Sequence, residues 1–348
     1  DVFFVISGYL IARPLLSELY GHDGIRLGRF YFRRLMRIFP AYLVTLWIGT
    51  RFWGSDSHGE NAWANLLLIN NFLTFDQQAL GWTWSLAVEE QFYVLFPLFL
   101  VAARRLIDHG IWVRGSLVAF WAFLAALLLR GVLVFHADTD WIQQPEPFHP
   151  RFDAAHFRVY FDSIYDKIYG HGGGIICGVG VACCERDTAL LRRLSQRRTL
   201  SIGLLLAAFS GLGFQIFGEA LPRTSLLAPS LRASLSVMFD TYLFALMTSY
   251  VLLYMLAVRA AGHTCMLDRM LSWRGFRPIA KLSYSAYLLH PMVVLLLWSR
   301  VNWDLASAGA VMILEHAGLS IIVTHLAALI LYLLVERPLH RLGRRLTR

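Results

Sequence analysis

The chain has 348 residues, of which 57% are hydrophobic and 16% are charged, and its mean hydropathy is +0.52. A soluble domain usually carries about 25% charged residues, so this composition argues against a soluble enzyme and favours repeated passage through a membrane. The net charge is +9, and 30 of the 32 basic residues are arginine. We assign this surplus to membrane topology rather than to nucleic-acid binding, because the arginines cluster beside apolar runs.

Apolar runs of membrane-spanning length recur along the whole sequence. A spanning helix needs about 20 apolar residues. Nine candidate runs have suitable length and composition: 2–20, 38–53, 82–103, 113–135, 171–184, 199–217, 236–258, 282–299 and 317–335. The stretch 61–75 is too polar and too short for a span, and we expect an interfacial or re-entrant segment there. The sequence predicts an all-α, multi-pass helical bundle that forms one membrane domain over residues 1–348.

The basic residues predict the orientation of this bundle. Nine spans place alternate loops on opposite sides of the membrane, and 29 of the 32 lysines and arginines then divide 23 to 6 between the two sides, while Arg13, Arg51 and Arg130 lie within or at the ends of spans. Cytoplasmic loops carry the excess of basic residues. We therefore expect a protein of the bacterial inner (plasma) membrane, with its C-terminal tail, residues 336–348, in the cytoplasm.

The first candidate site lies in FYFRRLMRIFPAY, residues 30–42. Arg34 and Arg37 are three residues apart and so share a helix face, and Pro40 is expected to punctuate the helix where it enters the membrane. Two guanidinium groups on one face can bind phosphate or carboxylate through paired hydrogen bonds. The alternative is that these arginines only anchor the helix at the inner surface.

The second candidate site lies in WTWSLAVEEQFY, residues 82–93. Glu89 and Glu90 fall about 10 Å inside a predicted span at 1.5 Å per residue, and Ser85 shares a face with Glu89. A carboxylate at that depth costs several kcal/mol unless it is paired or faces water. The residues favour a functional site, although both carboxylates could instead only pair with arginines of neighbouring helices.

Glycines crowd the segment YGHGGGIICGVGVA, residues 169–182. This segment lacks the GKS/T ending of a phosphate-binding loop, so we expect close helix packing at the following positions: Gly172, Gly173, Gly174, Gly178 and Gly180. His171 stands among these glycines, and its role is left open.

The sequence contains no recognisable metal site. The predicted outer loop 136–170 holds histidines and aspartates, but their spacing matches no defined metal-binding pattern. The four cysteines form no CxxC pair, which argues against a disulfide framework or a zinc site. We expect no metal cofactor.

The third candidate site lies in KLSYSAYLLHPMV, residues 281–293. His290 falls in the middle of a predicted span, and Pro291 directly follows it. Proline removes a backbone donor, so we expect a broken helix at this point. An imidazole beside a broken helix is typical of a cavity or a transport pathway, although a lone histidine is elsewhere more often a core residue.

Five segments in order resemble the successive signatures of acyltransferase family 3, a family of multi-pass bacterial enzymes. They are DVFFVISGYLI (1–11), FYFRRLMRIFPAY (30–42), WSLAVEEQFY (84–93), LSYSAYLLHP (282–291) and VERP (335–338). Each motif alone would be a weak signal, but five motifs in the family's order make a specific match. The resemblance implies about ten spans in the full-length protein, and about nine here.

The resemblance also implies an activity and a set of site residues. Members transfer an acyl group, expected here to be acetyl, from an acyl-CoA donor to a hydroxyl of a carbohydrate or glycolipid such as lipopolysaccharide or exopolysaccharide. Carried onto this chain, the family's residues are Arg34 and Arg37 for the donor, Glu89, Glu90 and His290 for catalysis, and Ser85, Tyr93, Ser283 and Tyr284 for the substrate. We expect the arginine pair and the two glutamates to line one reaction chamber.

The chain departs from the family at its beginning. Members carry an essential histidine in a first span upstream of the DVFFVISG motif, and this sequence begins at that motif. We therefore expect an N-terminally truncated member that is inactive alone. The missing histidine would be the catalytic base or an acyl carrier, and the role of His290 is left unassigned.

Two other functions remain open from the residues alone. Charged groups within spans and a broken helix also suit a transporter or flippase for a glycan or lipid-linked intermediate. The five motifs in the family's order argue against a transporter or flippase. A non-catalytic membrane subunit is the third possibility, and it is favoured if the natural chain begins at Asp1.

Overall fold

The computed structural model describes residues 1–21, 24–52, 60–108, 115–136, 158–217, 229–299 and 310–346. Within these ranges every regular element is a helix, which confirms the all-α prediction. The chain falls into two compact units, and each is described by itself. The first unit comprises Asp1–Ile25, Asn71–Phe75 and Trp84–Arg269, and the second comprises Arg26–Asn70, Asp76–Thr83 and Met270–Arg348.

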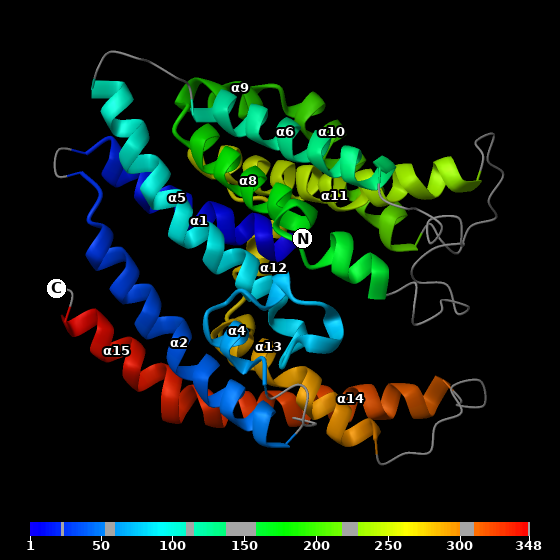
Figure 1. The fold of residues 1–348 in the computed structure, drawn as a ribbon. Coiled ribbons are helices and arrows are strands. Elements are labelled where there is room, and N and C mark those ends of the chain that lie inside the picture. The colour runs from blue at the N-terminus through cyan, green and yellow to red at the C-terminus, as the bar shows by residue number, and fades with distance from the viewer. Residues whose placement is uncertain are drawn as a thin grey trace. The chain divides into compact units, whose positions relative to one another are not determined.

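The first unit is built around helix α8. Its helices are α1 (Val2–Leu19), α5 (Trp84–Asp108), α6 (Gly115–His136), η4 (Phe161–Tyr165), α8 (Ile168–Glu185), α9 (Thr188–Gln196), α10 (Arg198–Phe217) and α11 (Pro229–Ala260). Helix α8 packs against α1, α6 and α11 (Figure 1). The short helix α12 (Met266–Leu271) follows α11.

Glycines allow α1 and α8 to touch backbone to backbone. A Cβ atom at Gly8 would lie 2.1 Å from the carbonyl oxygen of Ile175, and one at Gly178 would lie 2.1 Å from that of Val5. Neither helix could carry a side chain at these positions without moving apart. The predicted packing role is therefore confirmed for Gly178. By contrast, the nearest neighbours of a Cβ at Gly172 lie at an ordinary contact distance of 3.6 Å.

Arg130 joins three helices of the first unit. Its side chain is fully buried, and its guanidinium donates hydrogen bonds to the carbonyl oxygens of Gly170 on α8 and Val237 on α11. The Tyr242 ring lies 5.6 Å from the guanidinium carbon. A charge this deep in an apolar helix bundle is tolerated because backbone carbonyls and an aromatic face surround it.

The second unit contains two helix pairs. Its helices are α2 (Leu27–Phe52), α4 (Ala62–Leu66), η3 (Gly81–Thr83), α13 (Phe276–Trp298), α14 (Ala310–Leu331), η6 (Tyr332–Glu336) and α15 (Arg337–Leu346). Helix α13 packs against α14, and α15 packs against α2 (Figure 1). Two short 3-10 turns, η1 (Asn70–Phe72) and η2 (Phe75–Gln77), precede η3.

Two predicted helix interruptions are wrong. Helix α13 continues through Pro291, and α2 continues through Pro40. A proline removes one backbone donor, but the residues on both sides of Pro40 and of Pro291 are helical. The consequence at Pro291 is local and concerns the side chain of His290, as shown below.

Six helices in the described part of the chain are long and apolar enough to cross a membrane. They cover Val2–Leu19, Gly81–Arg105, Gly115–Phe135, Val237–Ala260, Phe276–Trp298 and Met312–Leu346. The predicted count of nine spans is not confirmed. The predicted runs 171–184 and 199–217, and the run 38–53 as far as residue 52, are also helical, but they lie outside this set. The stretch 61–75 contains only short helical turns, so it contributes no span.

Candidate active site

Helix α5 carries the two predicted carboxylates on buried positions. Glu89 is 2% exposed and Glu90 is 9% exposed. Val88, next to them, packs with Phe4 of α1 and Ile175 of α8. The hydroxyl of Tyr93, one turn further along α5, donates a hydrogen bond of 3.0 Å to Oε2 of Glu89. Both acids therefore lie inside protein rather than against lipid.

His171 lies in the same unit and is enclosed by aromatic rings. Its side chain is 5% exposed. The ring centroids of Trp84, Tyr165 and Phe4 lie 4.9, 5.0 and 5.5 Å from that of His171. Nε2 is 3.9 Å from Oδ1 of Asp1, the first residue of the DVFFVISG motif. The sequence pointed to His171 only through its position among glycines, and the tertiary contacts place it beside a motif residue.

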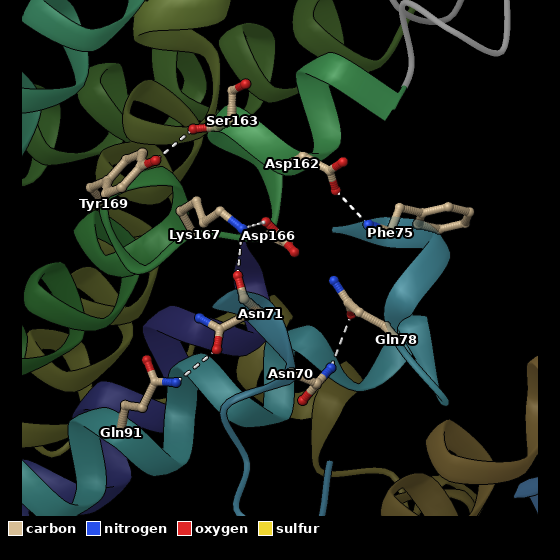
Figure 2. Close-up of polar contacts among 10 residues, drawn as sticks. All are labelled: Asn70, Asn71, Phe75, Gln78, Gln91, Asp162, Ser163, Asp166, Lys167 and Tyr169. Atoms are coloured by element: carbon tan, nitrogen blue, oxygen red, sulfur yellow. Dashed lines mark hydrogen bonds and ion pairs between the residues drawn. The ribbon is translucent and has the colours of Figure 1, made fainter. Parts of the chain in front are cut away.

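A polar network lies at the beginning of α8 (Figure 2). The Lys167 ammonium contacts Oδ1 of Asp166 at 2.8 Å and donates to the backbone oxygen of Asn71. The Asn71 side chain in turn accepts a 2.8 Å hydrogen bond from Gln91 of α5. These residues were not among the predicted site residues. For Asn71 the available signal was the pair of asparagines at 70–71, which directly follows the apolar run 66–69.

The second unit holds its own chain of buried polar contacts. The Tyr42 hydroxyl of α2 donates to the backbone oxygen of Asn65 at 2.8 Å, and the Asn65 amide donates to Oγ1 of Thr83 at 3.0 Å. Both Asn65 and Thr83 are fully buried. Asn70 also donates a hydrogen bond of 3.0 Å to Gln78, as Figure 2 shows. These bonds hold residues 76–83 against α2.

His290 occupies an exposed position on α13, directly before Pro291. A proline at 291 cannot donate to the carbonyl of Tyr287 four residues earlier. Nδ1 of His290 lies 2.8 Å from that carbonyl oxygen. Because a carbonyl oxygen only accepts, Nδ1 must carry the proton, and Nε2 of the neutral ring is left with a lone pair.

Two bonds between the WTW motif and α13 position this part of the helix. The Tyr287 hydroxyl donates to the backbone oxygen of Trp82 at 2.6 Å. The Trp82 indole donates to the backbone oxygen of Leu288 at 3.3 Å. Trp82, which lies two residues before the motif at 84–93, is thus in direct contact with the motif at 282–291, although Trp82 and Tyr287 are 205 residues apart in sequence.

Arg34 and Arg37 lie on α2 as predicted, where Arg34 is half-buried and Arg37 is exposed. The Tyr284 hydroxyl of α13 donates to the backbone oxygen of Ile38 at 2.9 Å, which brings the motif at 282–291 next to the motif at 30–42. Ser283 is exposed and donates to its own helix at Ala280.

The fully buried serine of α13 is Ser285, which sequence analysis did not select. Its hydroxyl donates a hydrogen bond of 2.8 Å to Oε2 of Glu336, the acidic residue of the VERP motif. This bond joins α13 to the beginning of α15, so the VERP motif has a positional role in the second unit.

The predicted site residues are therefore divided between the two units. Ser85, Glu89, Glu90 and Tyr93 belong to the first, while Arg34, Arg37, Ser283, Tyr284 and His290 belong to the second. The common chamber stays a prediction. Among the described residues no group of three histidine, cysteine or acidic side chains could hold a metal ion. Most of the predicted outer loop lies outside the described residues, at 137–157.

Comparisons with known proteins agree with the order of the motifs. The family model described as an acyltransferase domain matches residues 1–335. O-acetyltransferase OatA of Staphylococcus aureus is 26% identical over 99% of this chain and 52% of its own length. Nose resistant to fluoxetine protein 6 of Caenorhabditis elegans is 26% identical over 84% of this chain and 38% of its own length. No solved structure matches the chain.

The chain spans about half, or less, of the length of these relatives. The family match nevertheless covers nearly all of the chain and every one of the five motifs except the last three residues of VERP. The chain therefore belongs to acyltransferase family 3.

Proposed function

We propose that the protein transfers an acetyl group from acetyl-CoA to a hydroxyl of a carbohydrate or glycolipid, such as lipopolysaccharide or exopolysaccharide. The observation that carries this proposal is the alignment with an O-acetyltransferase over 99% of the chain. The buried Glu89 and the exposed His290, each on a motif helix, provide groups that suit this chemistry.

We place the protein in the bacterial inner membrane with its C-terminus in the cytoplasm. The 23 to 6 division of basic residues between the two predicted sides supports this orientation. Arg34 and Arg37 would then lie at the cytoplasmic face, where acyl-CoA is available. Their guanidinium groups would bind phosphate groups of the donor through paired hydrogen bonds.

A sugar hydroxyl is a weak nucleophile at neutral pH, so a base must remove its proton during attack. Within this chain Nε2 of His290 is the candidate base. The hydroxyl oxygen attacks the thioester carbonyl carbon as its proton moves to Nε2, the carbon–sulfur bond breaks, and the departing thiolate takes that proton. The resemblance expects a further histidine in an upstream span, which would take this role in the complete protein.

The remaining predicted residues would position the reactants. Glu89 and Glu90 would orient the base or hold the acceptor hydroxyl, and Tyr93 supports the Glu89 carboxylate through its hydrogen bond. Ser85, Ser283 and Tyr284 are candidate substrate contacts on the same two motif helices. The proposal assigns no role to a metal.

The test uses sealed membrane vesicles that contain the full-length protein, radiolabelled acetyl-CoA outside and a glycan acceptor. Transfer of label to glycan, with release of CoA, is the expected result. Movement of unmodified glycan across the membrane without label would identify a transporter and would contradict the proposal.

The donor site can be tested with lysine substitutions. We expect Arg34→Lys and Arg37→Lys each to raise KM for acetyl-CoA about tenfold, because lysine keeps the charge but loses the planar pair of donors. Arg33→Lys, on the exposed neighbouring position, is the matched control and should leave KM unchanged. Normal KM values for both test variants would remove the arginine pair from the donor site.

A further inference from the structure

Helices α2 and α15 form one strongly basic surface in the second unit. Its exposed cations are Arg33, Arg37, Arg341, Arg344 and Arg345. The helices touch closely, since a Cβ atom at Gly343 of α15 would lie 2.7 Å from Cβ of Met36 on α2. Figure 1 shows α15 running beside α2. We call this surface the α2–α15 surface.

The helices of this surface carry many more cations than carboxylates within their described parts. Glu336 is the one acidic residue in the described parts of α2, η6 and α15. It is buried, and its carboxylate accepts the hydroxyl of Ser285. The Arg37 charge acts on both Glu336 and His340, and the Arg344 charge also acts on His340. The positive charges of these arginines repel one another. An anion bound from outside would therefore stabilise this arrangement.

Apolar side chains lie among the arginines. Leu35 is 44% exposed, Leu342 is 45% exposed and Leu346 is 65% exposed. A soluble phosphate compound would need only the cations. A ligand that presents phosphate groups and acyl chains at one boundary would cover both kinds of side chain.

The length of the C-terminal helix places α15 at such a boundary. Residues Met312–Leu346 form a continuous helical segment of 35 residues. At 1.5 Å per residue this segment is about 52 Å long, whereas the hydrocarbon core of a bilayer is about 30 Å thick. The last turns must therefore leave the hydrocarbon, and α15, with its arginines and leucines, is the part that does so.

We propose that the α2–α15 surface binds the headgroups of anionic phospholipids, with the arginines on the lipid phosphates and the leucines between the first methylene groups. Because Arg37 is also assigned to the proposed donor site, the test substitutes only arginines of α15. It would tie the end of the C-terminal helix, and through the Ser285–Glu336 bond the motif helix α13, to the membrane surface.

The experiment measures lipid bound by purified full-length protein in neutral detergent. Phosphatidylglycerol and phosphatidylcholine are titrated separately, and bound lipid is counted by native mass spectrometry. We expect the triple variant Arg341→Gln, Arg344→Gln, Arg345→Gln to bind phosphatidylglycerol about 100-fold more weakly, since each cation near an anionic lipid surface contributes about fivefold. The triple lysine variant at the same positions should keep most of the binding and shows that the helix is intact.

Two controls make the result specific. The triple variant Arg192→Gln, Arg193→Gln, Arg197→Gln removes three exposed cations from the region of α9, and it should lose less than about threefold. An equal loss in both glutamine variants would show a diffuse effect of net charge and would overturn the proposal. Displacement of the lipid by adenosine 3′,5′-bisphosphate would assign the surface to a soluble nucleotide and would also overturn it.

Discussion

Helices α5 and α13 both carry family motifs, but they present their ionisable residues in opposite ways. Glu89 and Glu90 of α5 are buried among α1 and α8. His290 of α13 is exposed, and only one of its ring nitrogens is engaged. The two helices thus differ in how they present these groups: α5 carries carboxyl groups at buried positions, and α13 carries an imidazole at an exposed position.

The two arrangements also differ in what stabilises them. A buried carboxylate costs several kcal/mol unless neighbouring groups compensate for it, and the Tyr93 hydroxyl contributes one such group. His290 needs no acidic partner to define its tautomer, because the carbonyl released by Pro291 accepts the Nδ1 proton.

The largest effect is expected at His290. We predict that His290→Gln lowers kcat by about 100-fold or more, which is the usual contribution of a general base. His325→Gln is the matched control, because His325 also places Nδ1 near a carbonyl of its own helix, at 2.8 Å from Ile321. Equal activities of the two variants in the acetyl-transfer assay would remove His290 from catalysis.

A smaller loss of kcat is expected from substitution of the buried carboxylate of Glu89. Glu89→Gln should lower kcat about tenfold to 100-fold, because a hydrogen bond to a charged group is worth about 1.5–3 kcal/mol. Glu315→Gln, at an exposed position of α14, should have no effect. If Glu89→Gln lowered thermal stability but left kcat intact, the carboxylate would be only structural.

The smallest effect is expected from Pro291→Ala. Alanine restores a backbone donor to the Tyr287 carbonyl, so His290 loses its orienting bond while the helix is kept. We predict a fall in kcat of about threefold to tenfold at unchanged or raised Tm. A variant with full kcat would show that the Nδ1 contact does not define the active tautomer.

Local sequence patterns predicted the positions of most helices and the buried acids. Apolar runs identified α1, α5, α6, α11, α13 and α14 because a helix that meets lipid must be apolar over about 20 residues. The same reasoning failed for helices whose hydropathy is lowered by charged residues or by glycines. Helix α2 begins among arginines, and α8 is rich in glycine, so neither belongs to the six helices that satisfy length and composition.

The break predicted at Pro291 failed for a different reason. The rule that proline interrupts a helix describes an isolated segment, whereas α13 is packed against α14 and bonded to Trp82. Pro291 changed the hydrogen-bond partner of one backbone carbonyl, that of Tyr287. That consequence could be read only from coordinates, because it depends on the rotamer of His290.

The sequence by itself determined the family, the helical class and the membrane character, since these depend on ordered motifs and on local composition. Only the tertiary structure decided which distant residues meet: Trp82 with Tyr287, Asp1 with His171, and Gly8 with Ile175. Each of these contacts joins residues at least 160 positions apart in the chain. Periodicity and spacing report on neighbours along a helix, whereas such pairs are selected by the packing of whole helices.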